Sequence, residues 1–140
     1  MKLAALAVGL MLALPGVAAA KPLFQPWIDG TQASEPQTQV QRYDADTYVI
    51  RQSVKTNFEA PFLYLLFGKD RALLLDSGAG GLKIRPAVDA VIADWLAAHH
   101  RSSIPLVVAH SHGHGDHHMG DAEFKDRPDT TVVGLERDLS

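Results

Sequence analysis

The stretch IPLVVAHSHGHGDHHMG, residues 104–120, decides how the rest of this chain is interpreted. It begins with a short apolar run, residues 104–109, which is typical of a buried strand. Five of the seven histidines follow, with Asp116 and two glycines between them. Imidazole and carboxylate are usual ligands of borderline divalent metals such as zinc, and glycine lets the backbone bend so that side chains converge. The stretch therefore predicts a metal site at the end of a strand.

The spacing of these donors favours two metal ions over one. His112 and His114 are two residues apart, so on a chain that leaves a strand they project to the same side. Asp116 and His117 follow at once and can reach a second position. Two metals about 3.5–4 Å apart are a known arrangement for activating water in hydrolysis. Two other interpretations stay open, a metal-binding loop without catalysis and a group of histidines that binds no metal.

Residues 111–117, SHGHGDH, resemble the H-x-H-x-D-H signature of the metallo-β-lactamase-fold hydrolases. Ser111 stands where that family often has Thr or Ser, and Gly120 matches a glycine that commonly follows the motif. The resemblance covers residues 46–140 and implies an α/β fold, the N-terminal half of an αββα metallo-β-lactamase-like sandwich.

By this resemblance, His112 and His114 hold a first metal ion, and Asp116 and His117 hold a second. The implied cofactor is zinc, with two ions per complete domain, and iron or manganese would also suit these donors. The implied reaction is hydrolysis of an ester, lactone, thioester or lactam by a metal-bound hydroxide. Asp116 also orients that hydroxide, which makes it the expected catalytic residue.

The family takes three further ligands from its second half, two histidines and an aspartate, and no histidine follows His118 here. Each predicted half-site then has two protein ligands, fewer than the three or four of a tight zinc site. We therefore expect a truncated form that is inactive or weakly active alone. His110 and His118 are candidate substitutes, although the family gives neither of them that role.

A second stretch, Asp76-Ser77-Gly78-Ala79-Gly80-Gly81, ends another predicted strand. It lacks the G-x-x-x-x-G-K-[S/T] pattern of a phosphate-binding loop. In the family, an early D-[S/T]-G turn lies near the metal site. This implies that Asp76 orients the histidine loop (residues 110–118) through hydrogen bonds without ligating metal. The alternative is an aspartate that only caps a turn.

Composition restricts the chemistry. The 140 residues are 46% hydrophobic and 21% charged, which fits one soluble domain. The net charge of −3 gives no electrostatic case for binding nucleic acid. The chain has no cysteine, so disulfides and thiolate ligation of zinc are excluded. The expected partner is a small-molecule substrate.

Residues 1–20 are typical of a cleaved secretory signal peptide. Lys2 precedes an apolar run from Leu3 to Leu14, and three alanines at 18–20 form a small-residue cleavage site. The apolar run is shorter than the ~20 residues that a membrane-spanning helix needs, so no stable membrane anchor is expected. The sequence therefore predicts a periplasmic or secreted protein, cleaved after Ala20.

Residues 21–45 predict an extended leader rich in proline and glutamine. A loosely ordered arm is favoured there over docking of Phe24, Trp27 and Ile28 on the domain. From residue 46 onward, strands are expected at 47–54, 61–67, 71–76, 104–109 and 130–134, and the second and third of them form an antiparallel hairpin.

The apolar stripe over residues 84–99 predicts a helix that packs on the sheet, with His99 and His100 at its C-terminal cap. Residues 116–120 and 135–140 are each expected to begin a further helix. Continuously apolar strands are typical of a sheet covered on both faces. Half a sandwich would leave one face and an edge open, so self-association through the incomplete sheet is a further expectation.

Overall fold

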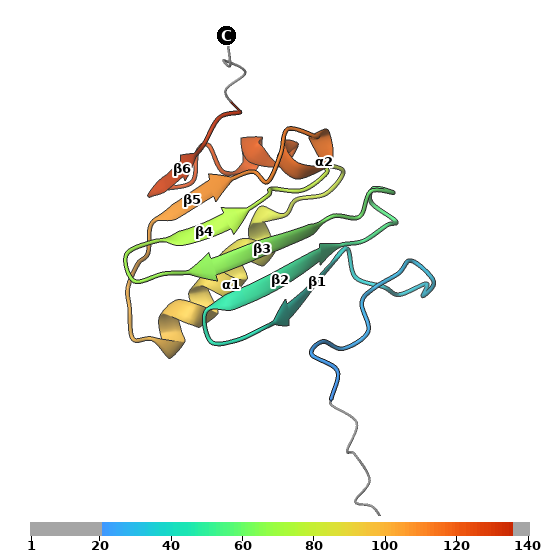
Figure 1. The fold of residues 1–140 in the computed structure, drawn as a ribbon, viewed down its shortest axis with the longest axis horizontal. Coiled ribbons are helices and arrows are strands. Elements are labelled where there is room, and N and C mark those ends of the chain that lie inside the picture. The colour runs from blue at the N-terminus through green and yellow to red at the C-terminus, as the bar shows by residue number, and fades with distance from the viewer. Residues whose placement is uncertain (1–20, 136–140) are drawn as a thin grey trace, which may run out of the picture.

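A computed structural model describes residues 21–135 and has the α/β fold that the sequence predicts. Six strands form one sheet in the order β1-β2-β3-β4-β5-β6 (Figure 1). The strands are β1 (Thr38–Arg42), β2 (Thr47–Gln52), β3 (Phe62–Phe67), β4 (Ala72–Leu75), β5 (Leu106–Ala109) and β6 (Thr130–Val132). The helices are α1 (Arg85–Ala98), α2 (Gly115–His118) and the 3₁₀ helix η1 (Asp121–Glu123). The predicted signal peptide and residues 136–140 lie outside the described residues.

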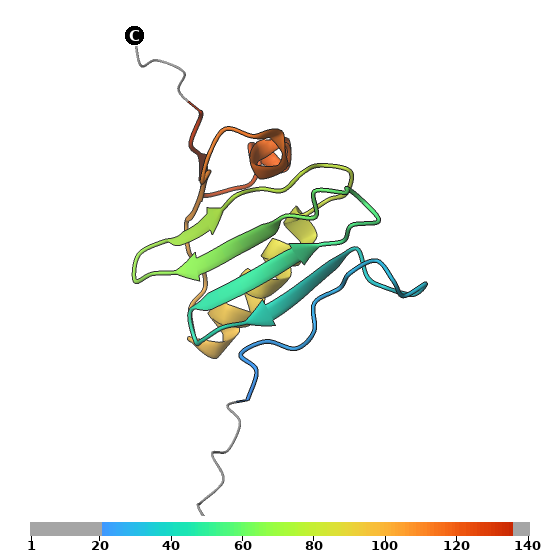
Figure 2. The same ribbon diagram turned by 45° about the vertical axis from the view of Figure 1, so that its right-hand side comes forward.

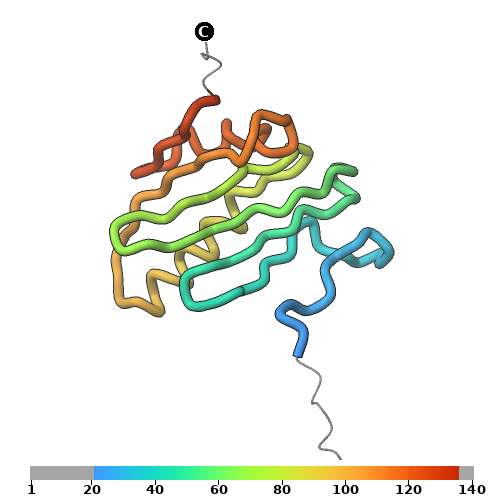
Figure 3. Tube along the Cα trace, in the orientation of Figure 1, coloured from blue at the N-terminus to red at the C-terminus, as the bar shows by residue number. Residues whose placement is uncertain are grey.

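The first four strands form an antiparallel meander, to which β5 and β6 add in parallel. The predicted hairpin of β3 and β4 is confirmed, and its turn is closed by Gly68 N–H, which donates to Arg71 O at 2.9 Å. β4 and β5 are parallel neighbours, so a long crossover must join them, and α1 is that crossover. The carboxyl ends of β4 and β5 therefore lie side by side (Figure 3).

Helix α1 packs across one face of the sheet (Figures 1 and 2). Its buried side chains are those of the predicted stripe, Val88, Val91, Ile92 and Trp95. They meet the strand side chains that point toward the helix, Ile50, Leu63, Leu65, Phe67, Ala72, Leu74, Leu106 and Val108. Removing this apolar surface from water is the main driving force for the fold. None of the helices within residues 21–135 has the length and apolar character needed to cross a membrane.

The C-terminal end of α1 lies far from the histidine loop, and the two histidines predicted as its cap are found there. His99 is the C-cap residue, and its ring stacks on Trp95 with centroids 4.0 Å apart. The other face of Trp95 stacks on Phe67 at 4.4 Å. His99 therefore has a structural role at the helix end.

The face of the sheet that points away from α1 is apolar but partly open. Tyr64, Leu66, Leu73 and Val107 alternate with the core residues and so point to this side. Tyr64 is 40% exposed. The apolar strands predict a second layer on this face. Among the described residues, a short segment around Trp27 covers part of it, and the Trp27 ring meets Phe62 edge-on with centroids 5.0 Å apart.

The sheet begins earlier than the sequence predicts, because the segment expected to be an extended leader contains β1. The part before it is docked on that strand rather than loose. Gln39 Oε1 accepts a hydrogen bond from Ile28 N–H at 2.8 Å, and Gln41 Oε1 accepts one from Gln25 N–H at 2.7 Å. These contacts use polar side chains, so they leave no apolar alternation from which a strand could be recognised.

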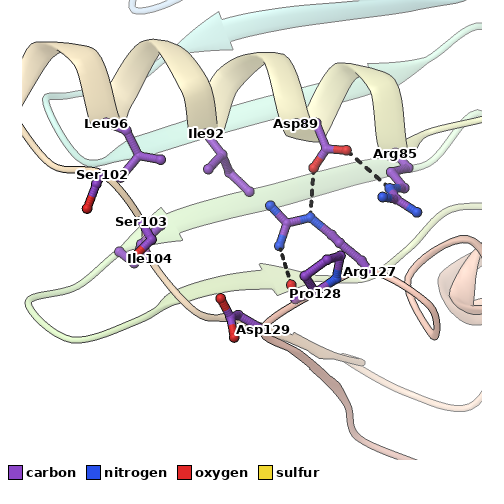
Figure 4. A pocket seen from close by; sticks show the side chains of 10 residues that line it. All are labelled: Arg85, Asp89, Ile92, Leu96, Ser102, Ser103, Ile104, Arg127, Pro128 and Asp129. Carbon is purple, nitrogen blue, oxygen red and sulfur yellow. Dashed lines mark hydrogen bonds and ion pairs between the residues drawn. The ribbon is translucent and has the colours of Figure 1, made fainter.

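Arg127 fastens the end of the described chain to α1 (Figure 4). Its Nε donates to Asp89 Oδ1 at 2.7 Å and its Nη1 donates to Thr130 Oγ1 at 3.0 Å. Arg85 holds the other oxygen of Asp89, Oδ2, at 3.1 Å. These bonds fix the start of β6 against the helix and so help to position the whole connection from β5 to β6, which contains the histidine loop.

Candidate metal centre

Two loops meet at the carboxyl ends of β4 and β5. The histidine loop leaves β5 and leads into α2, and the Asp76–Gly81 loop leaves β4 toward α1 (Figure 1). Asp76 N–H donates to Ala109 O at 2.8 Å, and Ser77 N–H donates to His117 O at 2.8 Å. The carboxyl ends of parallel strands are where sites form in layered α/β proteins. The pairing of β4 with β5 thus brings both predicted site segments together.

The structure brings the four predicted metal ligands into one cluster. The ring centroids of His112 and His114 are 4.7 Å apart, and those of His112 and His117 are 3.9 Å apart. Asp116 Oδ2 lies 3.0 Å from His117 Nε2. His112 and His114 are exposed, whereas Asp116 and His117 are half-buried. The cluster opens to solvent on its His112–His114 side.

Asp76 is buried beneath this cluster and makes the contacts that a positioning role needs. Its Oδ1 accepts Ser111 N–H at 2.7 Å, and its Oδ2 lies 2.8 Å from His117 Nδ1. Asp76 also adopts a left-handed backbone conformation, with φ of 69°, which is uncommon outside glycine and turns the chain sharply under the loop. The carboxylate thus connects the first and last parts of the histidine loop.

Burial and hydrogen bonding act in opposite directions on the pKa of Asp76. Desolvation by burial is the largest single influence and raises the pKa. The hydrogen bonds from Ser111 N–H, from His117 and from the Ser111 hydroxyl together outweigh it, so the pKa lies below its ordinary value. Asp76 is therefore an anion at neutral pH, as an acceptor for a metal-binding histidine should be.

The bond to Asp76 also determines which nitrogen of His117 is free. A carboxylate only accepts, so the proton of a neutral His117 ring lies on Nδ1, and Nε2 keeps its lone pair. Nε2 is the nitrogen that faces Asp116. This is the orientation that a ligand of zinc requires, because metal-bound histidines usually donate their other N–H to a carboxylate.

Ser111 has a larger role than its place in the motif suggests. Its hydroxyl donates to Asp76 Oδ2 at 2.9 Å and lies 3.0 Å from His112 Nδ1 and 3.2 Å from His117 Nδ1. One hydroxyl therefore touches both half-sites. In the sequence, the only indication of this role is that the resembled family often has Thr or Ser at this position, and that preference does not reveal the contacts of the hydroxyl.

His110 and Asp121 form a contact that, like the role of Ser111, could not be predicted from the sequence. The His110 side chain is 1% exposed, and its Nε2 lies 2.8 Å from Asp121 Oδ1, which also accepts the Ser77 hydroxyl at 2.7 Å. Its Nδ1 is buried without a hydrogen-bond partner among the described residues. His110 is thus bound to η1, and a substitute role as a metal ligand would require it to leave Asp121.

Gly120 and Gln52 both hold the Asp76–Gly81 loop in place, Gly120 from just after the histidine loop and Gln52 from the end of β2. A Cβ on Gly120 would lie 2.1 Å from Ser77 O, so only glycine allows this approach. Gln52 is fully buried, and its amide donates to Gly80 O at 2.7 Å and accepts from Ala79 N–H at 3.1 Å. A glutamine at the end of a strand carries no pattern that would reveal such a role in the sequence.

The candidate ligands have the chemical type that a divalent metal accepts, but only two of them belong to each predicted half-site. Imidazole nitrogen and carboxylate oxygen are ligands that zinc accepts, and both lie at the cluster. Within residues 21–135, no group of three or more His, Cys, Asp or Glu side chains is arranged to hold one ion. His112 with His114 and Asp116 with His117 are the two predicted pairs.

Comparisons with protein-family models, with curated proteins and with solved structures found no match to this chain. The resemblance of residues 111–117 to the metallo-β-lactamase-fold hydrolases therefore stays a prediction from the motif.

Proposed function

We propose that this chain carries the metal-binding part of a metal-dependent hydrolase of the metallo-β-lactamase fold. The observation that supports this most is the Asp76–His117–Asp116 arrangement. A buried carboxylate occupies one nitrogen of His117 and leaves the other beside Asp116, with the rings of His112 and His114 next to it. Metal-bound histidines usually donate their other N–H to a carboxylate in this way.

The proposed ligands are His112 and His114 for one zinc ion and Asp116 and His117 for a second, and iron or manganese are chemically acceptable alternatives. Asp76 and Ser111 hold these side chains in place. When bound, such ions supply a water of lowered pKa and positive charge at the oxygen that gains charge in the reaction.

The proposed reaction adds water to an acyl compound such as an ester, lactone, thioester or lactam. The water oxygen bonds to the acyl carbon, the bond to the leaving group breaks, and one water proton passes to the leaving group. Asp116 is the proposed proton acceptor, because its half-buried carboxylate lies at the open cluster, 3.0 Å from His117 Nε2.

The αββα sandwich and the periplasmic or secreted location belong to the same proposal. The apolar face that points away from α1 supports a second layer, since Tyr64 and its neighbours on that face are only partly covered by residues 21–135. The composition of residues 1–20 supports export.

Metal stoichiometry on the full chain tests the proposal. After gel filtration, zinc per chain is measured by elemental analysis for the wild type and for His112→Ala/His114→Ala. His99→Ala/His100→Ala is the matched control, because it removes the same number of imidazoles from the far end of α1. We expect zinc to bind to the folded wild type, to be lost in the first variant and to be retained in the control.

Hydrolysis of a panel of acyl compounds by the zinc-loaded chain is measured alongside. Zinc binding that the His112/His114 variant retains in full, or that the His99/His100 control loses equally, would contradict the proposed ligands. The gel filtration itself shows whether the metal-loaded species is one chain or two.

A second candidate is a metal-binding protein without catalysis. The observation in its favour is that no three donors in residues 21–135 are arranged to hold one ion, whereas a catalytic zinc site usually has three protein ligands. It predicts zinc uptake without turnover and full tolerance of Asp116→Asn. The hydrolase proposal predicts that Asp116→Asn loses turnover more strongly than it loses zinc.

A further inference from the structure

An open hollow of ≈ 580 Å³ lies directly beside the histidine loop. His114 and Asp116 form one wall, and the β2–β3 loop with Asn57, Phe58 and Glu59 forms the other. Its size falls within the usual range for small-molecule sites, which is about 300–1,000 Å³. It is the hollow in which a substrate would reach Asp116, so its lining bears on the substrate class.

Two large apolar side chains border this hollow while exposed to solvent. Phe58 is 81% exposed and Met119 is 61% exposed. They come from separate elements, the β2–β3 loop and the end of α2. Single exposed apolar residues are ordinary, but two that face one hollow beside a candidate centre indicate an apolar binding surface.

The backbone that carries Phe58 and the side chain of Met119 are both held in place. Asn57 Nδ2 donates to Ala79 O at 3.2 Å, and its Oδ1 accepts Glu59 N–H at 2.9 Å, which fixes the turn that presents Phe58. Met119 lies along two glycines: a Cβ on Gly115 would be 3.2 Å from its sulfur, and one on Gly80 would be 3.5 Å from its Cβ. The two apolar side chains are therefore presented to the hollow from a fixed turn and a packed helix end.

The charges of the hollow are of one sign. Asp116 and Glu59 are carboxylates, and no lysine or arginine is among the described residues that line it. Because Asp116 is a proposed zinc ligand, Glu59 is the carboxylate that faces an anionic substrate group, and that group finds no guanidinium or ammonium partner among the described lining residues. A neutral group that can cover Phe58 and Met119 meets no such cost.

We propose that this hollow selects neutral acyl substrates with an apolar acyl chain, such as medium-chain esters or lactones, and disfavours anionic ones. The proposal rests on the proposed hydrolase function and narrows its substrate class. Phe58 and Met119 contact the acyl chain, and Glu59 repels anions. Sulfate and phosphate monoesters, and β-lactams with their carboxylate, become poor substrates.

The first test compares hydrolysis of p-nitrophenyl acetate and p-nitrophenyl hexanoate by the zinc-loaded full chain. We expect the preference for hexanoate, as the ratio of the two kcat/KM values, to fall by about tenfold in Phe58→Ala and in Met119→Ala. Tyr43→Ala is the matched control, an exposed aromatic residue in the β1–β2 turn at the other end of the sheet, and should keep the wild-type ratio.

Glu59→Lys tests the charge preference. It should raise the rate on p-nitrophenyl phosphate relative to p-nitrophenyl hexanoate by about fivefold, because it replaces a repulsive charge with an attractive one. An unchanged hexanoate preference in both alanine variants, or a wild type that prefers the phosphate, would overturn the proposal.

A binding measurement separates failure of the substrate class from failure of the hydrolase function. Met119 is one of three methionines, and its methyl signal in a ¹³C-methyl-methionine NMR spectrum is the one that Met119→Leu removes. In metal-free protein, neutral hexananilide should shift this signal and hexanoate ion should not. If no ester is hydrolysed but hexananilide shifts Met119, catalysis by this chain alone fails and the apolar site stands. If neither compound shifts it, or both shift it equally, the proposed selectivity is wrong.

Discussion

His110 and His112 are two residues apart in the chain, yet they lie in different environments. The His110 side chain is 1% exposed and bound to Asp121, whereas His112 is exposed and contacts other histidines. The same division runs through residues 110–120. His110, His117 and Gly120 form an anchored side, which is tied to the Asp76–Gly81 loop or to η1, and His112, Gly113 and His114 form an open side.

The difference teaches how a histidine-rich loop can serve structure and chemistry at once. The anchored side gives the loop one conformation through Asp76, Ser77 and Asp121. The open side has few restraints, and its imidazoles are free to bind. Counting histidines treats the two sides alike, and substitutions on each side should separate them.

The largest expected effect comes from Asp76→Asn, which removes the carboxylate that anchors the loop. His117 loses its charged acceptor, so zinc affinity should fall about 10–100-fold. Loss of hydrogen bonds to a charged group should also lower the free energy of unfolding by about 2 kcal/mol. Competition titration with a zinc chelator and urea unfolding measure the two effects. Asp70→Asn, in the exposed β3–β4 turn, is the control and should change neither.

The two glycines give the next comparison. Gly120→Ala places a methyl group 2.1 Å from Ser77 O and should lower the free energy of unfolding by about 1–3 kcal/mol. Gly113→Ala adds a methyl group with nothing within 4 Å, and the change should stay within about 0.5 kcal/mol. Equal urea midpoints for the two variants would remove the distinction between the anchored and the open side.

His110→Ala and His112→Ala should separate in the same way, with a smaller difference. The first removes the imidazole from Asp121, which keeps the Ser77 hydroxyl, and creates a cavity, which should cost about 1–2 kcal/mol of stability. The second changes stability by less than about 0.5 kcal/mol but weakens zinc binding. Thermal unfolding without metal and zinc titration, run on both proteins, give the comparison. A His110→Ala chain as stable as His112→Ala would mean that the Asp121 contact is not important.

The smallest expected effect is the pH dependence that Asp76 contributes. Its pKa is lower in the folded chain than the ordinary value, so the folded state favours the anion. The resulting stabilisation is present above the unfolded pKa of about 3.9 and is lost as pH falls through the folded pKa. The difference in unfolding free energy between wild type and Asp76→Asn should therefore be constant from pH 7 to 5 and shrink toward pH 3. A difference that grows on acidification would mean that folding raises the pKa of Asp76 and does not lower it.

The sequence predicted most of the elements because apolar patterning decides them. The helical stripe of α1, the hairpin of β3 and β4 and the strand before the histidine loop all follow from side chains that must leave water. β1 was not predicted because it has no apolar alternation. Its Gln39 and Gln41 side chains bind the preceding segment through amide hydrogen bonds. Such bonds depend on which backbone groups come near, and no periodicity in the sequence encodes that.

The candidate site also has a part that the sequence predicts and a part that it does not. The spacing of His112, His114, Asp116 and His117 and the position of Asp76 at a strand end are visible in the sequence. The roles of Ser111 and Asp121 are not, because each depends on a contact that the β4–β5 pairing creates, and the role of Gln52 depends on the β4–α1 loop reaching the end of β2. Tertiary contacts of this kind can be read from a structure but not from local residue patterns.

The contacts of Asp76 also have a consequence for the order of folding. Asp76 meets Ser111 across 35 residues of chain and His117 across 41. Closing so long a loop is entropically costly, and contacts with large sequence separation tend to form late. The cluster should therefore assemble after α1 has docked and β5 has joined β4. Zinc would then slow unfolding of the finished chain and leave its folding rate almost unchanged, a kinetic asymmetry that stopped-flow measurements with and without zinc can detect.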